Sequence, residues 1–266
     1  MAKINRVIVM QTLNKWKYFW ITSFLTGINY IKLLGVVKTK DMSVGDSLGF
    51  LFLGIRPISH LDPTQLFNIP FLWLSMCLYL FYSLAAMIRA TSSTYDYLTF
   101  FYLRKRRTYW FFKVKHTLVI ISIHFMVIII TSIICTILFG GRVSISPTMT
   151  FWTSFIPKGS VVSGFQFIFQ TMIMPWLACA TIGILELTLL YFGGELQSFI
   201  IISIYLIMSS FFTSPLLIGN YLMLLKSSIV EDKGIDNLSG ILVMVVSMIV
   251  LNVVGIVKLR KWDYMN

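Results

Sequence analysis

The stretch that decides the fold runs from Thr117 to Phe139 and reads TLVIISIHFMVIIITSIICTILF. It contains no Asp, Glu, Lys or Arg, and its length meets the ~20 apolar residues that a helix needs to cross a lipid bilayer. Five further apolar stretches have comparable length, at about 18–37, 70–88, 165–192, 198–218 and 241–257. The sequence therefore predicts an all-α integral membrane protein with six transmembrane helices in a single domain, residues 1–266.

The composition of the chain agrees with this class. Hydrophobic residues make up 57% of it and charged residues only 12%, against roughly 25% charged residues in soluble domains. The formal net charge of +12 would suggest a nucleic-acid partner in a soluble protein. In a membrane protein, Lys and Arg gather in cytoplasmic loops during insertion and near anionic lipid. We therefore expect membrane lipid, and no nucleic acid, as a partner.

The positions of the basic residues predict the orientation of the chain. Residues 1–17 place Ile4, Val7 and Ile8 on one helical face, which is typical of an interfacial helix on the membrane surface. Outside the six predicted spans, fourteen Lys and Arg fall on the side of both termini and seven on the other side. The positive-inside rule then places both termini in the cytoplasm. We expect the chain to cross the cytoplasmic membrane of a bacterium, and the bacterial source is inferred from the composition.

Two segments break the simple pattern of spans. The long connection 38–68 contains the apolar run Leu48 to Ile55, which is too short to cross a bilayer. It is either a re-entrant or surface-lying segment or a packed loop, and the first is the preferred interpretation. Pro175 lies inside the fourth predicted span, where it removes one backbone hydrogen bond and should bend the helix.

The motifs of several enzyme classes are missing from the sequence. No glycine-rich phosphate-binding loop followed by Lys and Ser or Thr occurs, so the chain is not expected to hydrolyse ATP. His60, His116 and His124 lack the spacing of a zinc protease, and the three cysteines lie singly in apolar runs. We expect no catalytic site, no metal and no cofactor bound by this chain.

Polar residues inside the spans are the candidates for function. The first span carries Thr22, Thr26 and Asn29, so this helix should face protein and not lipid. Glu186 is the only acidic residue clearly inside a span, within about two turns of the predicted cytoplasmic end. Intramembrane acids are functional candidates by default, although a hydrogen bond to a neighbouring helix would also explain one. These four residues are the candidates for a translocation path.

The basic segment before the third span carries a family resemblance. It reads Tyr95-Asp96-Tyr97 and then Arg104-Lys105-Arg106-Arg107-Thr108-Tyr109-Trp110-Phe111-Phe112-Lys113. Basic residues followed by aromatics between spans two and three, with an amphipathic amino-terminal helix and six spans, resemble the membrane subunits of type-2 ABC exporters. The resemblance is one of layout over the whole chain. It departs from many family members because the longest outer connection here is 38–68 and does not lie between spans five and six.

The resemblance implies a permease that forms a dimer with an identical or related chain and binds two copies of a separate cytoplasmic ATPase, which holds ATP and Mg. The dimer interface would lie on spans one, two and five. A coupling helix docked on the ATPase would fall between about Ala90 and Arg107, with Ser92 to Thr94 as its cap. Its contact residues would be Thr94, Tyr95, Asp96, Tyr97, Phe100, Phe101, Arg104, Arg106 and Arg107.

The functional prediction is therefore the permease subunit of an exporter that moves an amphipathic or hydrophobic cargo, with a peptide favoured by analogy. Two alternatives remain open. The first is a membrane immunity or assembly protein that binds a peptide or a partner within the bilayer without transport. The second is an intramembrane enzyme that uses Glu186 or His124.

Overall fold

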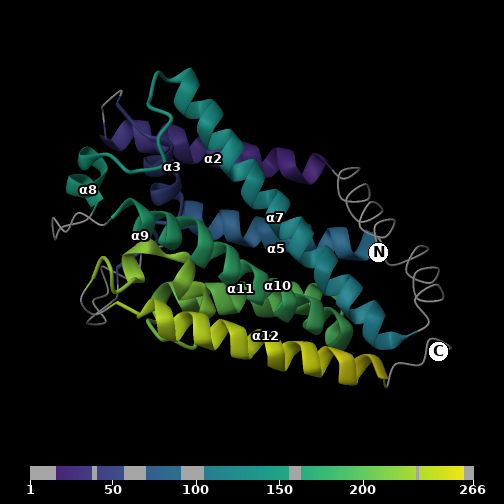
Figure 1. Ribbon diagram of the computed structural model, residues 1–266. Helices are drawn as coiled ribbons and strands as arrows, with labels where there is room; N and C mark the ends of the chain where they lie inside the picture. The colour runs from purple at the N-terminus through teal and green to yellow at the C-terminus, as the bar shows by residue number, and fades with distance from the viewer. Residues whose placement is uncertain are drawn as a thin grey trace.

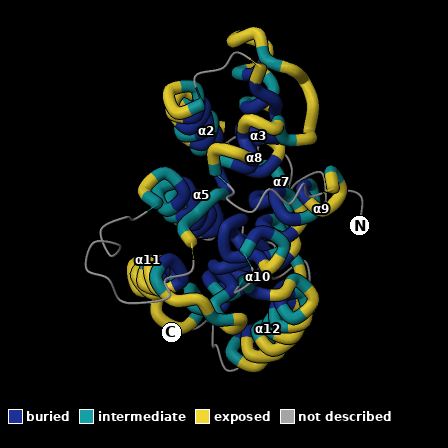
Figure 2. Tube along the Cα trace, turned by 90° about the vertical axis from the view of Figure 1, so that its left-hand side faces the viewer, coloured by how far each residue is buried: buried dark blue, intermediate teal, exposed yellow. Residues whose placement is uncertain are grey.

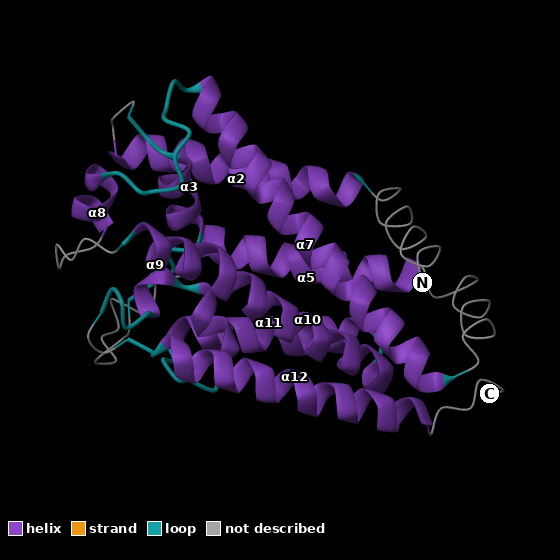
Figure 3. Cartoon of the chain, viewed as in Figure 1, coloured by secondary structure: helices purple, strands orange, loops and turns teal. Residues whose placement is uncertain are grey.

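The computed structural model describes residues 16–37, 41–56, 70–90, 105–155, 163–231 and 234–260. These ranges are almost entirely helical and contain no strand, only two isolated bridges (Figure 3). The predicted interfacial helix lies outside the described residues except for positions 16 and 17. Within these ranges, five helices are long and apolar enough to cross a membrane, and Glu195–Phe211 is a shorter apolar helix. The prediction of an all-α membrane protein is confirmed at this level.

The long helices form an antiparallel bundle. Along the chain they are α2 (Lys17–Val37), α5 (Phe71–Ala90), α7 (Arg106–Leu138), α9 (Gly164–Ile168) with the π-helix η1 (Phe169–Ile173) and α10 (Met174–Gly193), then α11 (Glu195–Phe211) and α12 (Asn237–Arg260). Figure 1 shows the start of α2 and α7 and the end of α12 together on the right. We call this the basic end, after Lys17, Arg106, Arg107 and Lys258.

The opposite end of the bundle, here the loop end, consists of short elements. They are α3 (Val44–Leu51), α8 (Met149–Phe155), and the 3-10 helices η2 (Ile218–Leu222) and η3 (Leu224–Lys226). The first half of the apolar run Leu48 to Ile55 is the end of α3, which packs against α2 and α7. Because it is only eight residues long, α3 fills the bundle without crossing it.

The centre of the bundle is α10. Two thirds of an 18-residue apolar part of the stretch from Gly164 to Gly193 is buried, and α10 packs against α5, α7, α11 and α12 (Figure 2). Small residues on α10 permit this packing: a Cβ on Gly183 would lie 2.7 Å from the Ile121 side chain on α7. By contrast, α2, α11 and α12 leave large apolar side chains exposed, as expected of helices that face lipid.

The predicted bend at Pro175 takes the form of a change of helix type. The chain is a π-helix from Phe169 to Ile173, and α10 then begins at Met174 with Pro175 in its first turn. Because the residues before α10 are helical as well, Pro175 still removes one backbone donor, and the hydrogen-bond register changes in η1 just before it. The fourth predicted span is thus built from α9, η1 and α10 in succession.

Two boundaries differ from those expected. The helix that contains the predicted third span begins well before Thr117, because the basic and aromatic residues from Arg106 onward belong to the same helix without interruption. The fifth helix ends at Phe211 and not near Ile218, and the apolar residues Ile218 to Leu222 form η2, which is buried at the loop end. At the second place, apolar composition predicted burial but did not distinguish a span from a packed segment.

Candidate functional site

The polar residues of α2 lie inside the chain. Thr22 and Thr26 are fully buried and Asn29 is 1% exposed. Thr26 Oγ1 donates to the Thr22 carbonyl oxygen at 2.8 Å, and Asn29 Nδ2 donates to the Ser47 carbonyl oxygen on α3 at 3.4 Å. The prediction that this helix turns its polar face toward protein is consistent with this burial. The face is covered by α3 and α7 of the same chain.

His124 joins three helices. Its Nδ1 lies 2.8 Å from Thr22 Oγ1 on α2, and its Nε2 lies 2.9 Å from Ser83 Oγ on α5. The single Ser83 hydroxyl proton is donated to the Leu80 carbonyl oxygen at 2.8 Å. Ser83 Oγ must therefore accept from Nε2–H, and Nδ1 accepts from the Thr22 hydroxyl. Both ring nitrogens are thus satisfied, and the ring, fully buried and 4.8 Å from that of Phe19, is a structural tie.

Glu186 has a contrasting environment. Its side chain is fully buried on α10, and neither carboxyl oxygen has a hydrogen-bond partner among the described residues. Gly183, one turn earlier, faces Thr117, Ile121 and Leu84. Residues three apart lie on the same side of a helix, so Glu186 follows Gly183 along the side of α10 that meets α5 and α7. Thr117 Oγ1 on that helix also lacks a partner within the described residues.

The basic end is held together by side chains from three helices. Trp110 Nε1 on α7 donates to Asn252 Oδ1 on α12 at 2.9 Å, and the Trp110 ring lies 5.8 Å from that of Tyr191 on α10. Arg106 donates to the Leu259 carbonyl oxygen at 3.3 Å. A Cβ on Gly255 would lie 2.2 Å from Trp110, so this glycine is what allows α12 to approach. The first turns of α7 are therefore firmly attached to the bundle.

The predicted coupling residues divide into two groups. Arg106 and Arg107 form the first turn of α7, where Arg107 is exposed and lies 5.7 Å from the Phe111 ring centre. The other predicted contacts lie outside the described residues: Thr94, Tyr95, Asp96, Tyr97, Phe100, Phe101 and Arg104. The structure therefore positions only the carboxyl-terminal edge of the predicted coupling segment.

Two buried charged residues at the loop end were not singled out from the sequence. Asp46 accepts from the Ser43 N–H at 2.8 Å and from the Thr148 N–H at 2.7 Å, joining the start of α3 to the residue before α8. Burial raises the pKa of Asp46 above its usual value, while these hydrogen bonds oppose the rise. The capping pattern of Ser43 followed by Asp46 three residues later was a visible signal.

Lys226 is the second of these residues. Its ammonium group donates to the carbonyl oxygens of Ser209 at 2.6 Å, Ser210 at 2.9 Å and Phe212 at 3.2 Å, and to Asn220 Oδ1 at 3.0 Å. It thereby satisfies the last turn of α11, where backbone carbonyls lack helical partners. In the sequence, Lys226 is one of the basic loop residues that indicate the orientation, and no local pattern predicts this role.

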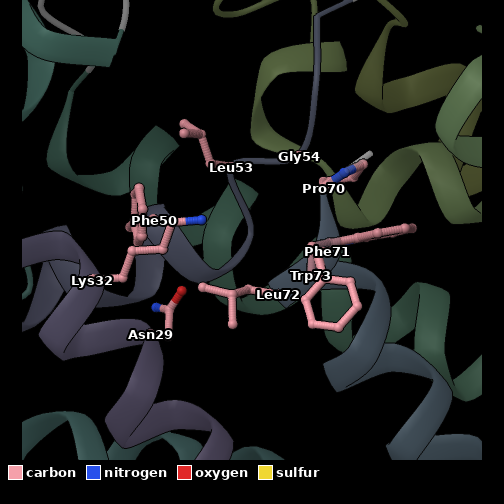
Figure 4. A pocket seen from close by; sticks show the side chains of 9 residues that line it. All are labelled: Asn29, Lys32, Phe50, Leu53, Gly54, Pro70, Phe71, Leu72 and Trp73. Atoms are coloured by element: carbon pink, nitrogen blue, oxygen red, sulfur yellow. The ribbon is translucent and has the colours of Figure 1, made fainter. Parts of the chain in front are cut away.

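A pocket of about 200 Å³ opens at the loop end between α2, the residues around α3 and the start of α5. Asn29 and Lys32 line it from α2, and Phe50 and Trp73 form apolar walls (Figure 4). Within the described ranges, no group of His, Cys, Asp or Glu side chains is arranged to hold a metal ion.

Comparison of the chain with models of protein families, with curated proteins and with solved structures finds no match in any of the three. The geometry described above therefore carries the functional argument.

Proposed function

We propose that this chain is the transmembrane permease subunit of an ATP-binding cassette exporter. It would move an amphipathic or hydrophobic cargo, a peptide in the favoured case, by alternating access. A separate cytoplasmic ATPase would bind ATP and Mg and drive the movement. In this proposal α2, α5, α7, α9 to α10, α11 and α12 make six crossings of a bacterial cytoplasmic membrane. Both termini and the basic end then face the cytoplasm.

The observation that carries the proposal is the continuity of α7. Its 33 residues extend for about 50 Å at ~1.5 Å per residue, whereas the hydrocarbon core of a bilayer is ~30 Å thick. Part of the helix must therefore lie beyond the hydrocarbon, and the basic and aromatic residues from Arg106 place that part at the basic end. A rigid helix fixed to α10 and α12 can transmit movement from a peripheral protein into the membrane.

The arrangement of three other helices supports a dimer. The helices α2, α5 and α11, which match predicted spans one, two and five, lie along one side of the bundle (Figure 2). Tyr79 of α5 donates to the Tyr18 carbonyl oxygen of α2 at 2.7 Å, and the rings of Tyr82 and Phe199 join α5 to α11 at 5.9 Å. This face would meet its counterpart on a second permease copy.

The proposed path then requires movement within each chain. Thr22, Thr26 and Asn29 are buried between α2 and its neighbours α3 and α7, so cargo would reach them only when α2 separates from these helices. The bond between Thr22 and His124 would break in that step. Glu186, on α10, would contribute near the cytoplasmic opening.

Isolation of the tagged chain from its own host in mild detergent tests the proposal. We expect a stoichiometric nucleotide-binding subunit, identified by mass spectrometry, and ATP hydrolysis by the complex. Changing Arg106 and Arg107 together to Gln should reduce the bound ATPase about tenfold, which corresponds to one lost charge-assisted contact. Lys17→Gln, at the same end, is the control. A folded chain without an associated ATPase would contradict the permease function.

A second candidate is an immunity or assembly protein that binds a peptide or partner in the bilayer without transport. The satisfied polar contacts of Thr22, Thr26 and His124 favour it, because a static packed interior needs no movement of α2. Such a protein would keep its function when Arg106 and Arg107 are neutralised. An enzyme that uses Glu186 would lose activity on Glu186→Gln, whereas unchanged activity would exclude that role.

A further inference from the structure

The pocket at the loop end contains two polar groups that no other part of the described chain satisfies. Asn29 is 1% exposed, and its Oδ1 atom has no hydrogen-bond donor among the described residues. Figure 4 shows this oxygen directed into the space between the labelled side chains. Leaving a buried amide oxygen unpaired is unfavourable, so the site favours a ligand that supplies a donor.

Lys32 provides a cation at the same pocket. It lies one helical turn after Asn29 on α2, is exposed, and makes no ion pair or hydrogen bond in the described parts of the chain. No acidic residue is among the described residues that line the pocket. Among the described residues, the site thus combines an unpaired acceptor with an unpaired positive charge, which is complementary to an anion that also carries a hydroxyl or N–H donor.

The walls and size of the pocket limit the ligand further. Phe50, Leu53 and Trp73 are apolar walls, and Trp73 is held in place by donating to the Leu222 carbonyl oxygen at 3.1 Å. The volume of about 200 Å³ is below the ~300–1,000 Å³ of pockets that enclose a drug-sized molecule. The pocket can therefore take a headgroup but not the whole of a large ligand.

The surface of α2 beside the pocket accounts for the remainder of such a ligand. Ile21, Phe24, Ile28 and Lys32 are spaced by three, four and four residues, so they share one helical face. The first three are large apolar residues exposed by 46%, 66% and 36%, respectively. Lys32 therefore lies at one end of an exposed apolar stripe on α2, close to the unpaired amide oxygen of Asn29.

We propose that this site binds an anionic lipid whose headgroup carries a hydroxyl, as a glycerol phosphodiester does. The phosphate lies at Lys32, the headgroup hydroxyl donates to Asn29 Oδ1 inside the pocket, and one acyl chain follows Ile28 and Phe24 along α2. The inference requires only that the chain lies in a membrane and does not depend on the permease function. A lipid held there joins α2 to the α3 and α5 sides of the loop end.

Native mass spectrometry of the full chain in detergent tests this with three lipids of identical acyl chains. Phosphatidylglycerol carries the charge and the hydroxyl, phosphatidylmethanol only the charge, and phosphatidylcholine neither. We expect one phosphatidylglycerol per chain and about a tenfold preference over phosphatidylcholine, which corresponds to about 1.4 kcal/mol for the two contacts together, with phosphatidylmethanol intermediate.

Two variants separate the two contacts. Lys32→Met should abolish the preference for phosphatidylmethanol over phosphatidylcholine and leave phosphatidylglycerol only the smaller preference that its hydroxyl gives. Asn29→Leu should make phosphatidylglycerol and phosphatidylmethanol equal. Lys17→Met, an exposed lysine at the other end of α2, controls for general attraction of anions. Since Lys32 is exposed, its variant should fold even if the Asn29 variant does not.

Three results would overturn the proposal. The first is equal retention of all three lipids by the unaltered chain. The second is a preference lost equally in Lys17→Met and Lys32→Met, which would indicate nonspecific charge. The third is displacement of phosphatidylglycerol, one for one, by a short peptide with a free terminal carboxylate but not by its amidated form, which would assign the pocket to a peptide.

Discussion

Lys226 and Glu186 are both buried in this chain, yet their surroundings are opposite. The Lys226 ammonium group at the loop end has four oxygen acceptors within 3.2 Å. The Glu186 carboxyl group in α10 has no partner among the described residues. Burying a polar group is favourable only when its hydrogen bonds are replaced. We therefore expect the first residue to stabilise the fold and the second to cost stability.

Removing the Lys226 ammonium group should have the largest effect. Lys226→Met keeps the length of the side chain but leaves carbonyl oxygens at the end of α11 unpaired, each costing about 1–3 kcal/mol unless water enters. We expect a loss of about 3 kcal/mol in the free energy of unfolding, measured in detergent by denaturant titration followed by circular dichroism. Lys258→Met, a half-buried lysine over the Phe192 ring, should cost much less. Equal losses in the two variants would mean that the four hydrogen bonds of Lys226 do not contribute to the free energy of unfolding.

Replacing Glu186 should change stability in the other direction. Glu186→Leu removes an unpaired polar group from a packed interior, and we expect a gain of about 1 kcal/mol in the same titration. Glu186→Gln is the matched control, because it keeps a polar group of similar size and should give little or no gain. A large loss of stability in Glu186→Leu would show that the carboxyl group has a partner and is structural.

The two residues also differ in how easily the sequence reveals that they are buried. Glu186 stands out because it is an acid in an apolar stretch, and a short apolar window is enough to find it. Lys226 follows a break in the apolar pattern, where a lysine usually faces solvent or lipid headgroups. Its four acceptors come from α11 and η2, and this convergence depends on how residues 212–226 fold back, which no local pattern encodes.

The difference between local patterns and contacts distant in sequence also explains which parts of the helices were predictable. The spans were predictable because lipid demands long apolar helices with their backbone hydrogen bonds satisfied internally. The ends were less predictable, because Arg106 to His116 form a helix through packing of Trp110 and Tyr191 and not through apolar composition. The hydrogen bonds of His124 to Thr22 and Ser83 could not be predicted either, because the three residues lie on three different helices. Each polar residue was visible, but their pairing was not.

The smallest effect expected is the pH dependence of the Lys226 contribution. Burial lowers the pKa of Lys226 from 10.5 to about 8. Above pH 8 the unfolded chain therefore binds a proton that the folded chain has lost, and stability should rise with pH up to about 10.5. From pH 7.5 to 9 the unaltered chain should gain about 1 kcal/mol relative to Lys226→Met. Other titrating groups cancel when the free energies of unfolding of the two chains are subtracted. If the stability of the unaltered chain relative to Lys226→Met fell as pH rises, the carbonyl oxygens would hold the ammonium form more strongly than burial opposes it.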